Sequence, residues 1–447
     1  MKLIDKFCDF VEQTTIDDLP SDVVEFTKHL TLKTMAGMIS GSRTESGYKM
    51  NNFIKNIDTS SEAGVIGSGF KSSIEYAILA NGHYAHAAEL EDDQFPSATS
   101  DITVTPVIIP VAECFNLSGN KIIEATALAL EIMNRIGYFS LTPKGITDLP
   151  FYGIIGAAIA TAKALDFDAK TIRSTIGIAI GRASGFIINF GTDAHYLESS
   201  LACRDGYLSA IFAKNGMTGL ANNSDISDWL KSIHSNPNLP VSELVKDLGS
   251  KWFIKNIWIK KYPCCFLTHR QIDMMLDIKK KYNLTHDDVK HIELDVGPID
   301  ATCDRPTPID IEDSRFSFQH ILSGVLIEDE VDHRIFTEKK IIDPLYIKTR
   351  SKIKVNNHHD WPPEFNSGIA RVVVTLKDGK QIIETSEQAL GGPKRPLTQE
   401  QFIELYRKYT KDVIPEDIVK ETCNILLDLE NKSADEVATL IKMVTYI

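Results

Sequence analysis

Apolar positions spaced as in helices dominate the first part of the chain. Residues 121–139 are apolar on most faces, and residues 153–165 are rich in alanine and glycine. Helices of this composition must be buried among other helices that approach them closely. The same spacing predicts helices over residues 170–182 and from about Ser199 to a stop at Asn215-Gly216. The pattern therefore predicts a large helical domain.

The pattern changes to alternating apolar and polar positions at residue 289. Residues 289–296 alternate as a half-buried strand does, and residues 370–385 form two such runs around Asp378-Gly379, a strong hairpin signal. After Gly391-Gly392-Pro393 the helical pattern resumes at residue 398. We therefore predict a mainly α protein. An all-α domain of residues 1–262 is completed by residues 394–447, and residues 263–393 form a smaller α+β lid domain with an antiparallel sheet.

Composition is that of an ordinary soluble globular protein. The chain has 447 residues, of which 43% are hydrophobic and 24% charged, and it is long enough for a large buried core. The net charge of -13 argues against nucleic acid as a partner, because binding to phosphates requires clustered lysine and arginine. An anionic substrate would need a local cationic pocket.

No segment indicates export or membrane insertion. The first residues lack the uninterrupted apolar core of a signal peptide, and no stretch of about 18 apolar residues occurs. The seven cysteines include no CxxC pair, so neither a disulfide framework nor a structural zinc site is indicated. We expect a cytoplasmic protein whose partners include neither a membrane nor nucleic acid.

The densest group of ionisable residues follows an apolar, alanine-rich run. Residues 81–93 contain two histidines and four carboxylates. If the helix continues, His86, Glu89 and Asp93 lie at i, i+3 and i+7 and share one stripe. In such an acid/base surface, Glu89 and Asp93 could orient His86, or one carboxyl could be held protonated by its like-charged neighbours. The alternative is a helix end whose carboxylates are simply solvated.

A second group of ionisable residues lies where another helix is expected to begin. Residues 189–198 place a glycine-led turn before a helix, with His195 and Glu198 at i and i+3. Free backbone N–H groups at such a turn can bind an anion. The alternative is a plain helix start. His86 with Glu89 and His195 with Glu198 form two His-x-x-Glu pairs. Metal sites in helical bundles use the reverse order, Glu-x-x-His, so we predict no metal.

A third group lies just before a proline. Lys260 and Lys261 precede Pro263, and a new helix opens near His269. Paired lysines in this position suit carboxylate binding at a domain seam, although lysines in a surface loop are also common. Cys265 could act as a thiol acid/base of the kind that cofactor-independent racemases use, but a buried cysteine is more often a small hydrophobic residue.

Together these segments resemble the MmgE/PrpD family, which includes 2-methylcitrate dehydratase, cis-aconitate decarboxylase and iminodisuccinate epimerase. Residues 81–93 resemble its NG-x-x-AH-x-x-D-F-DD segment. Four further motifs follow in order: G-x-x-G-A-A at 153–158, N-F-G-T at 189–192, A-A-R-N-G at 202–206 and K-x-Y-P-x-C-x-x-x-H at 260–269. The resemblance covers nearly the whole chain. It implies a large all-α domain completed by the C-terminal end, a smaller α+β lid and a homodimer.

Several acid/base positions of the family differ in this chain. Its acidic motif begins with Asp and continues to a Thr and a His-Pro, where this chain has Glu89, Asp93 and Phe95-Pro96. The histidine of its Gly-Phe-His-Pro motif has no counterpart at residues 145–148. The lysine of its G-T-M-x-K-P-L-H motif falls at His195 and the final histidine at Glu198. Lys260, Cys265 and His269 are retained, so the best-known family reactions cannot be transferred residue by residue.

The family reactions form or quench a carbanion next to a carboxylate, without a cofactor. Such chemistry needs fixed positive charge and a base within reach of the α-proton. We expect the Lys260 ammonium to supply the positive charge that stabilises the carbanion. We expect His195 to act as the acid or base, because histidine gains and loses a proton near neutral pH. Histidine in place of the family's lysine at position 195 removes a permanent positive charge. We therefore expect a substrate that has one carboxylate fewer than a tricarboxylate, or one whose carboxylate is placed differently. The candidate catalytic residues are His86, Glu89, Asp93, His195, Lys260 and His269, and the candidate substrate-binding residues are Lys144, Thr192, Lys261 and Cys265.

The leading functional hypothesis is a cofactor-independent lyase, of the hydro-lyase type, for a small hydroxy- or amino-substituted carboxylic acid. One alternative is an epimerase or isomerase of a dicarboxylate, with His195 opposed by Cys265 or His269. Another is a decarboxylase of an unsaturated polycarboxylate. The last is a non-catalytic family member that binds carboxylates, although its retained histidine, glutamate and lysine residues argue against this.

Overall fold

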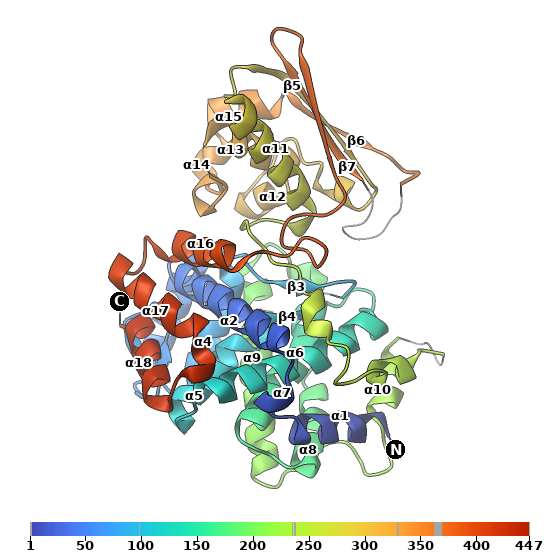
Figure 1. Ribbon diagram of the computed structural model, residues 1–447, viewed down its shortest axis with the longest axis vertical. Helices are drawn as coiled ribbons and strands as arrows, with labels where there is room; N and C mark the ends of the chain where they lie inside the picture. Colours follow the sequence, from blue (N-terminus) through green and yellow to red (C-terminus); the bar gives the residue numbers. More distant parts are fainter. Residues whose placement is uncertain are drawn as a thin grey trace. The chain divides into compact units, whose positions relative to one another are not determined.

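The computed structural model describes residues 2–446 except 98, 235, 237, 329 and 362–368. The chain forms two compact units, one of Met1–Trp258 with Thr398–Ile447 and one of Ile259–Leu397. The described residues are mainly helical, as the sequence predicts (Figure 1). None of their helices combines the length and the apolar composition needed to cross a bilayer.

The first unit is a bundle of helices drawn from both ends of the chain. The C-terminal helices α16 and α17 pack against α2, and α18 packs against α5 (Figure 1). The bounds are α1 Leu3–Gln13, α2 Ser21–Gly41, α3 Glu45–Ile57, α4 Ile74–Ala87, α5 Thr105–Phe115, α6 Gly119–Ser140, α7 Asp148–Ala164, α8 Ala169–Ile180, α9 Asp193–Lys214, α10 Ile226–Ile233, α16 Gln399–Thr410, α17 Glu416–Leu427 and α18 Ala434–Thr445.

The helices α6, α7 and α8 confirm the sequence predictions, and their small residues explain the close packing. A Cβ atom at Gly206 of α9 would lie 2.4 Å from the Cβ of Ala157 on α7, so only glycine allows this approach. The start at about Ser199 that apolar spacing predicts is too late, because α9 begins at Asp193, directly after the glycine-led turn that is expected to precede a helix. Gly191, with φ 82°, ends the preceding turn. The first turn of α9 is polar, so apolar spacing does not reveal it.

The description of this unit as all-α is corrected by two short antiparallel strand pairs. The strands β1 (Ala63–Val65) and β2 (Phe70–Ser72) form a hairpin whose turn contains Gly67 and Gly69, both with positive φ. The strands β3 (Asp93–Gln94) and β4 (Thr99–Ser100) form the second pair. Runs this short carry too few positions for an alternating pattern to be recognised.

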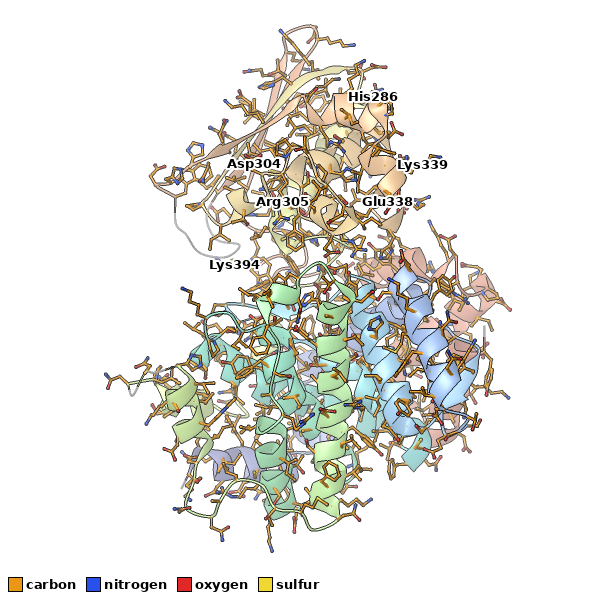
Figure 2. The ribbon with its side chains drawn as sticks, turned by 180° about the vertical axis from the view of Figure 1, so that it is seen from behind. His286, Asp304, Arg305, Glu338, Lys339 and Lys394 are labelled. Carbon is orange, nitrogen blue, oxygen red and sulfur yellow. The ribbon has the colours of Figure 1, made fainter. Side chains whose placement is uncertain are left out.

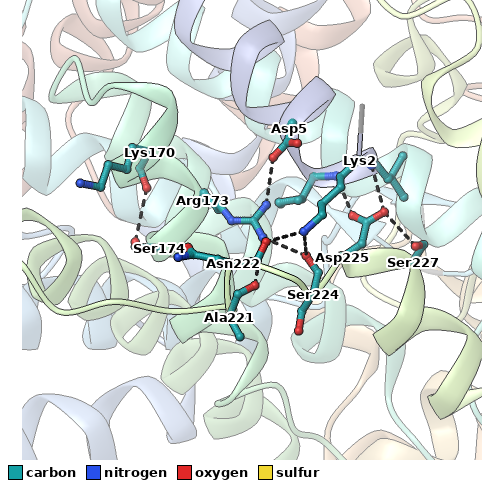
Figure 3. Close-up of polar contacts among 12 residues, drawn as sticks. Lys2, Asp5, Lys170, Arg173, Ser174, Ala221, Asn222, Ser224, Asp225 and Ser227 are labelled. Carbon is teal, nitrogen blue, oxygen red and sulfur yellow. Dashed lines mark hydrogen bonds and ion pairs between the residues drawn. The ribbon is translucent and has the colours of Figure 1, made fainter.

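The start of α1 is tied to a loop that follows α9. Arg173 of α8 binds Asp5 at 2.9 Å and donates to the carbonyl oxygens of Ala221, at 3.2 Å, and Ser224, at 2.8 Å (Figure 3). The Asp225 carboxylate accepts the free N–H groups of Leu3 and Ile4 at the N-terminal end of α1. These contacts satisfy polar groups at a helix end, which apolar packing cannot do.

The second unit is a four-stranded sheet with helices packed on it. Its strand order is β6-β5-β7-β8, and α11 packs on β7 and β8 (Figure 1). The bounds are α11 His269–Tyr282, β5 Val289–Val296, α12 Ile311–Arg315, α13 Phe318–Ile327, α14 Glu338–Ile341, α15 Pro344–Arg350, β6 Ile353–Asn357, β7 Ala370–Leu376 and β8 Gln381–Ser386. The strand predicted at 289–296 and the hairpin with its turn at Gly379, φ 88°, are confirmed.

The prediction of an antiparallel sheet is right only in part, because β6 pairs with β5 in the parallel direction. The chain between these strands forms the helices α12 to α15, and a helical crossover of this length is the connection that parallel strands require. The other pairings, β5 with β7 and β7 with β8, are antiparallel. The sheet is therefore mixed.

One face of this sheet carries the core of the second unit. Ile292, Leu294, Val372 and Val374 are fully buried with residues of α11 and α13, while alternate positions on the strands are more exposed. Charged side chains lie on the outside of the unit, including Asp304, Arg305, Glu338 and Lys339 (Figure 2). The arrangement is that of an α+β layer with a solvated exterior.

A buried arginine secures an irregular loop of the first unit. Arg135 of α6 forms an ion pair with Glu131, Nε to Oε1 2.6 Å, and both side chains are inaccessible to solvent. Its guanidinium also donates to four backbone carbonyl oxygens, those of Leu244, Lys246, Asp247 and Lys251. The loop thus uses one cation to satisfy acceptors that no helix or strand satisfies.

We expect Arg135→Met to lower the free energy of unfolding by roughly 3–5 kcal/mol, because it leaves the Glu131 carboxylate buried without its cation. Arg182→Met is the matched control, because the Arg182 side chain is 62% exposed and its partner Asp205 also pairs with Arg204, so its loss should cost no more than about 1 kcal/mol. Urea denaturation followed by circular dichroism measures both. Equal effects of the two variants would contradict the role given to Arg135.

Candidate functional site

The predicted acid/base stripe does not exist as a helical feature, because α4 ends at Ala87. The Glu89 N–H donates to the carbonyl oxygen of His86 at 2.8 Å, and Glu89 has φ 55°, in the left-handed region. The chain therefore turns away from the helix axis, and Asp93 lies in β3 rather than on the helix. Helical spacing cannot relate His86 to Glu89 and Asp93 beyond this turn.

The alternative of a solvated helix end is also wrong, because the carboxylates after α4 are buried. Glu89 is 6%, Asp92 0% and Asp93 8% exposed. Lys33 of α2 compensates the Asp92 charge with an Nζ to Oδ1 distance of 2.8 Å, and its ammonium also donates to the carbonyl oxygen of Leu90. A buried ion pair with further hydrogen bonds fixes the course of the segment.

Asp101 extends this buried network. Its carboxylate accepts the Asp92 N–H at 3.1 Å and the hydroxyl of Thr34, the neighbour of Lys33 on α2. Sequence reasoning missed Lys33 and Asp101. Lys33 had a usable signal, since it is a single lysine inside an apolar stretch of α2, where a charge needs a buried partner.

Two of the predicted catalytic residues, His86 and His195, lie against each other. Their ring centroids are 4.5 Å apart in an edge-to-face arrangement that joins α4 to the first turn of α9. Tyr196 lies 5.2 Å from His86 and Phe190 4.4 Å from His195, also between centroids. The structure thus places two imidazoles side by side among aromatic rings. Phe190 belongs to the N-F-G-T motif, whereas Tyr196 gave no sequence signal beyond its proximity to His195 along the chain.

Glu198 lies beside this pair, as the i, i+3 spacing predicts. Its Oε2 is 3.7 Å from His195 Nδ1, and its Oε1 accepts from the Asn189 amide at 2.6 Å and the Phe186 N–H at 3.0 Å. Burial acts to raise the pKa of Glu198, but His195 and these two donors outweigh it and leave that pKa below the ordinary value. Glu198 is therefore an anion at neutral pH.

A third imidazole, that of His83, supports the α4–α9 contact through a hydrogen bond. His83 Nε2 lies 2.8 Å from the Ser46 hydroxyl, which donates to Asp193 at the start of α9 at 2.5 Å. Burial lowers the pKa of His83 from 6.5 to about 4. Because the Ser46 proton is committed to Asp193, Ser46 accepts from His83, which is neutral with its proton on Nε2.

The loop between α6 and α7, which holds the candidate binding residue Lys144, contacts the segment before α9. The Thr142 hydroxyl lies 2.8 Å from the Ser97 hydroxyl and 3.2 Å from the Asp148 carboxylate, and Ile146 forms an isolated β-bridge with Phe186. The predicted binding residue Lys144 is exposed in this loop. Thr192, the other candidate of this unit, uses its hydroxyl locally, donating to the Asn189 carbonyl oxygen at 2.8 Å.

The lysines of the second unit differ in their surroundings. Lys261 forms an ion pair with Asp273, which also accepts from the Tyr262 hydroxyl at 2.9 Å and the Leu390 N–H at 3.0 Å. Burial lowers the pKa of Lys261, and Asp273 acts against this shift. Lys261 thus serves as one donor of a local network. Lys260 is 3% exposed and lies in the same segment.

His269 is fully buried at the start of α11. Its ring stacks on Phe266, 4.7 Å between centroids, and meets the edge of Tyr262 at 5.0 Å. Burial, together with the charges of Lys261 and Lys260, holds its pKa well below the ordinary value, so the imidazole is neutral. A hydrogen bond with Cys303 lowers the pKa of the Cys265 thiol. Among the described residues, no three His, Cys, Asp or Glu side chains gather as a metal site would require.

We expect His83 to make the protein acid-sensitive. Its folded-state pKa lies below the ordinary value, so the unfolded state takes up a proton as pH falls from about 6.5 to 4, and the free energy of unfolding drops by roughly 3 kcal/mol. His83→Gln keeps an N–H donor for Ser46 and removes the titration. Urea denaturation at pH 7 and pH 4.5 should show a smaller loss in the variant. Equal losses would contradict this account.

Comparison with known proteins agrees with the resemblance drawn from the sequence motifs. The MmgE/PrpD N-terminal domain matches residues 5–230, and the MmgE/PrpD C-terminal domain matches residues 262–431. Relatives include the cis-aconitate decarboxylase of Homo sapiens, 23% identical over 98% of this chain and 94% of the relative. The cis-aconitate decarboxylase of Aspergillus terreus is 26% identical over 95% of this chain and 92% of the relative. The chain belongs to the MmgE/PrpD family.

Proposed function

We propose that this protein is a lyase that acts on a small carboxylic acid through a carbanion next to a carboxylate group. The observation that carries the proposal is the contact of His86 with His195, 4.5 Å between ring centroids. Imidazole is the side chain best suited to gain and lose a proton near neutral pH. The family membership and the decarboxylase relatives support the reaction class.

Two adjacent imidazoles favour a division of roles. Two positive charges in a buried contact repel each other, so the pair carries one proton more easily than two. One ring is then neutral and can act as a base while the other can act as an acid. The Glu198 carboxylate, 3.7 Å from His195 Nδ1, can stabilise the charge that His195 acquires when it accepts a proton.

The leading reaction is the elimination of water. His195 removes the α-proton, the electron pair forms a carbon–carbon double bond, and the departing hydroxide takes a proton from His86 and leaves as water. A second candidate, decarboxylation, is favoured by the named activity of the relatives. In that reaction the carbon–carbon bond to a carboxylate breaks, carbon dioxide leaves, and the electron pair stays behind as a carbanion. An imidazolium then gives its proton to this carbanion. Both routes need positive charge to stabilise the carbanion.

Incubation in D2O with a panel of hydroxy acids and unsaturated polycarboxylates, followed by proton NMR, separates these reactions. A new alkene signal from a hydroxy acid indicates a hydro-lyase, and deuterium at the carbon that lost carbon dioxide indicates a decarboxylase. Exchange with inversion and no elimination would replace the proposal with an epimerase. Binding without any exchange would indicate a non-catalytic protein.

We expect His86→Gln and His195→Gln each to lower kcat/KM by roughly 10²- to 10⁴-fold, because each removes a proton-transfer group. The double variant should be little worse than either single one, because the two rings act together. His29→Gln is the control, since His29 is a half-buried ring stacked on Phe402 elsewhere in the unit and is not part of the pair. Steady-state kinetics measure the three variants, and activity within a few-fold of wild type in His86→Gln and His195→Gln would exclude this pair.

A separate proposal concerns Lys260 as a carboxylate-binding residue. Lys260→Met keeps the length of the side chain and removes the charge, so KM should rise roughly 10- to 100-fold, the effect of losing a hydrogen bond between charged groups. Lys281→Met, at an exposed lysine of α11, should leave KM unchanged. An unchanged KM in Lys260→Met would remove this residue from substrate binding.

A further inference from the structure

A serine of α9 contacts one ring of the imidazole pair. Ser199 Oγ lies 2.8 Å from His86 Nδ1, and both side chains are buried. Ser199 is four residues after His195, so one helical turn separates them and both face α4. Among the described residues this is the only polar contact of the Ser199 hydroxyl. No sequence motif distinguished it.

The close approach of the two helices makes this hydrogen bond possible. A Cβ atom at Gly82 of α4 would lie 2.9 Å from Cys203 Sγ and 3.1 Å from the Cα of Ser200. Only a residue without a side chain allows α9 to come this near. Gly82 is one turn before His86 on α4, so the tight contact and the Ser199–His86 hydrogen bond lie next to each other.

We infer that Ser199 is a positioning residue for His86. Its hydroxyl holds the Nδ1 atom of His86, so that His86 exchanges protons through Nε2. The inference rests on the proposed function. An imidazole ring can rotate by half a turn and can carry its proton on either nitrogen, so an unanchored ring would present the wrong atom part of the time. A hydrogen bond at Nδ1 removes this freedom before the substrate binds.

A hydroxyl is well suited to a ring that must change its charge. Serine can donate to Nδ1 or accept from it, so the hydrogen bond persists in neutral imidazole and in imidazolium. A carboxylate in the same place would favour the charged form, because a negative charge next to an imidazole stabilises the imidazolium. Ser199 can therefore orient His86 without holding it in one protonation state.

The other serine–imidazole contact of this region shows the contrast. The Ser46 proton is committed to Asp193, so Ser46 can only accept from His83 Nε2. Burial keeps His83 neutral by lowering its pKa to about 4, although the Asp193 charge and the Ser46 contact act in the opposite direction. Among the described residues, no such carboxylate accepts the Ser199 proton, which can therefore follow the state of His86. The two serines thus differ in whether their proton is free to follow the state of the imidazole that they contact.

The test compares Ser199→Ala with Ser200→Ala. These serines are adjacent on α9 and fully buried, but the Ser200 hydroxyl donates to the Leu197 carbonyl oxygen of its own helix at 3.0 Å. We expect Ser199→Ala to lower kcat roughly 10- to 100-fold with little change in KM and to displace the pH profile of kcat. Ser200→Ala should retain wild-type kinetics, and Ser199→Thr, which keeps a hydroxyl, should recover part of the activity.

Nitrogen NMR of protein with 15N-labelled histidine supplies a readout that needs no turnover. The His86 signals, assigned by their loss in His86→Gln, should report a changed tautomer population or a changed titration in Ser199→Ala and not in Ser200→Ala. Unchanged His86 signals in Ser199→Ala would overturn the inference. Changed signals with normal kinetics in both Ser199→Ala and His86→Gln would instead overturn the proposed function, while the contact itself would stand.

Discussion

The buried ion pair of Lys33 with Asp92 is the interaction on which the candidate site depends. Placing two charges where solvent does not reach them is costly unless each finds a partner, and their close contact meets this need. Lys33 also binds the Leu90 carbonyl oxygen, so one ammonium determines the path of the segment after α4. That path begins with the turn at Glu89, which ends the helix just beyond His86. The position of His86 at a helix end thus follows from a charge on another helix.

The contact between α4 and α9 gives this helix end a chemical partner. Gly82 and Gly206 remove the side chains that would separate α9 from α4 and from α7. The approach brings His195 against His86 and places Ser199 within hydrogen-bonding distance of the same ring. Serine, histidine and aspartate side chains of α3, α4 and α9 then bind each other, which offsets much of the cost of placing polar groups in an apolar bundle.

Elements with a strong local pattern were predictable from the sequence, and elements defined by distant partners were not. The strand β5 and the hairpin of β7 and β8 follow from alternation and an Asp-Gly turn. The parallel pairing of β6 depends on a long helical crossover, and the turn at Glu89 depends on Lys33, more than fifty residues away in the chain. Likewise, His86 and His195 could be named from motifs, but the hydrogen bond that orients His86 comes from a serine that resembles any other on its helix.

The proposed function requires that a carboxylic acid is bound and transformed at the His86–His195 pair. Its most direct test is a titration of histidine-labelled protein with a di- or tricarboxylate, followed by the imidazole nitrogen signals of each assigned histidine. We expect the His86 and His195 signals to move together and saturably, while those of His29, stacked on Phe402, stay in place. Saturable binding of the acid that leaves both His86 and His195 unmoved would contradict it.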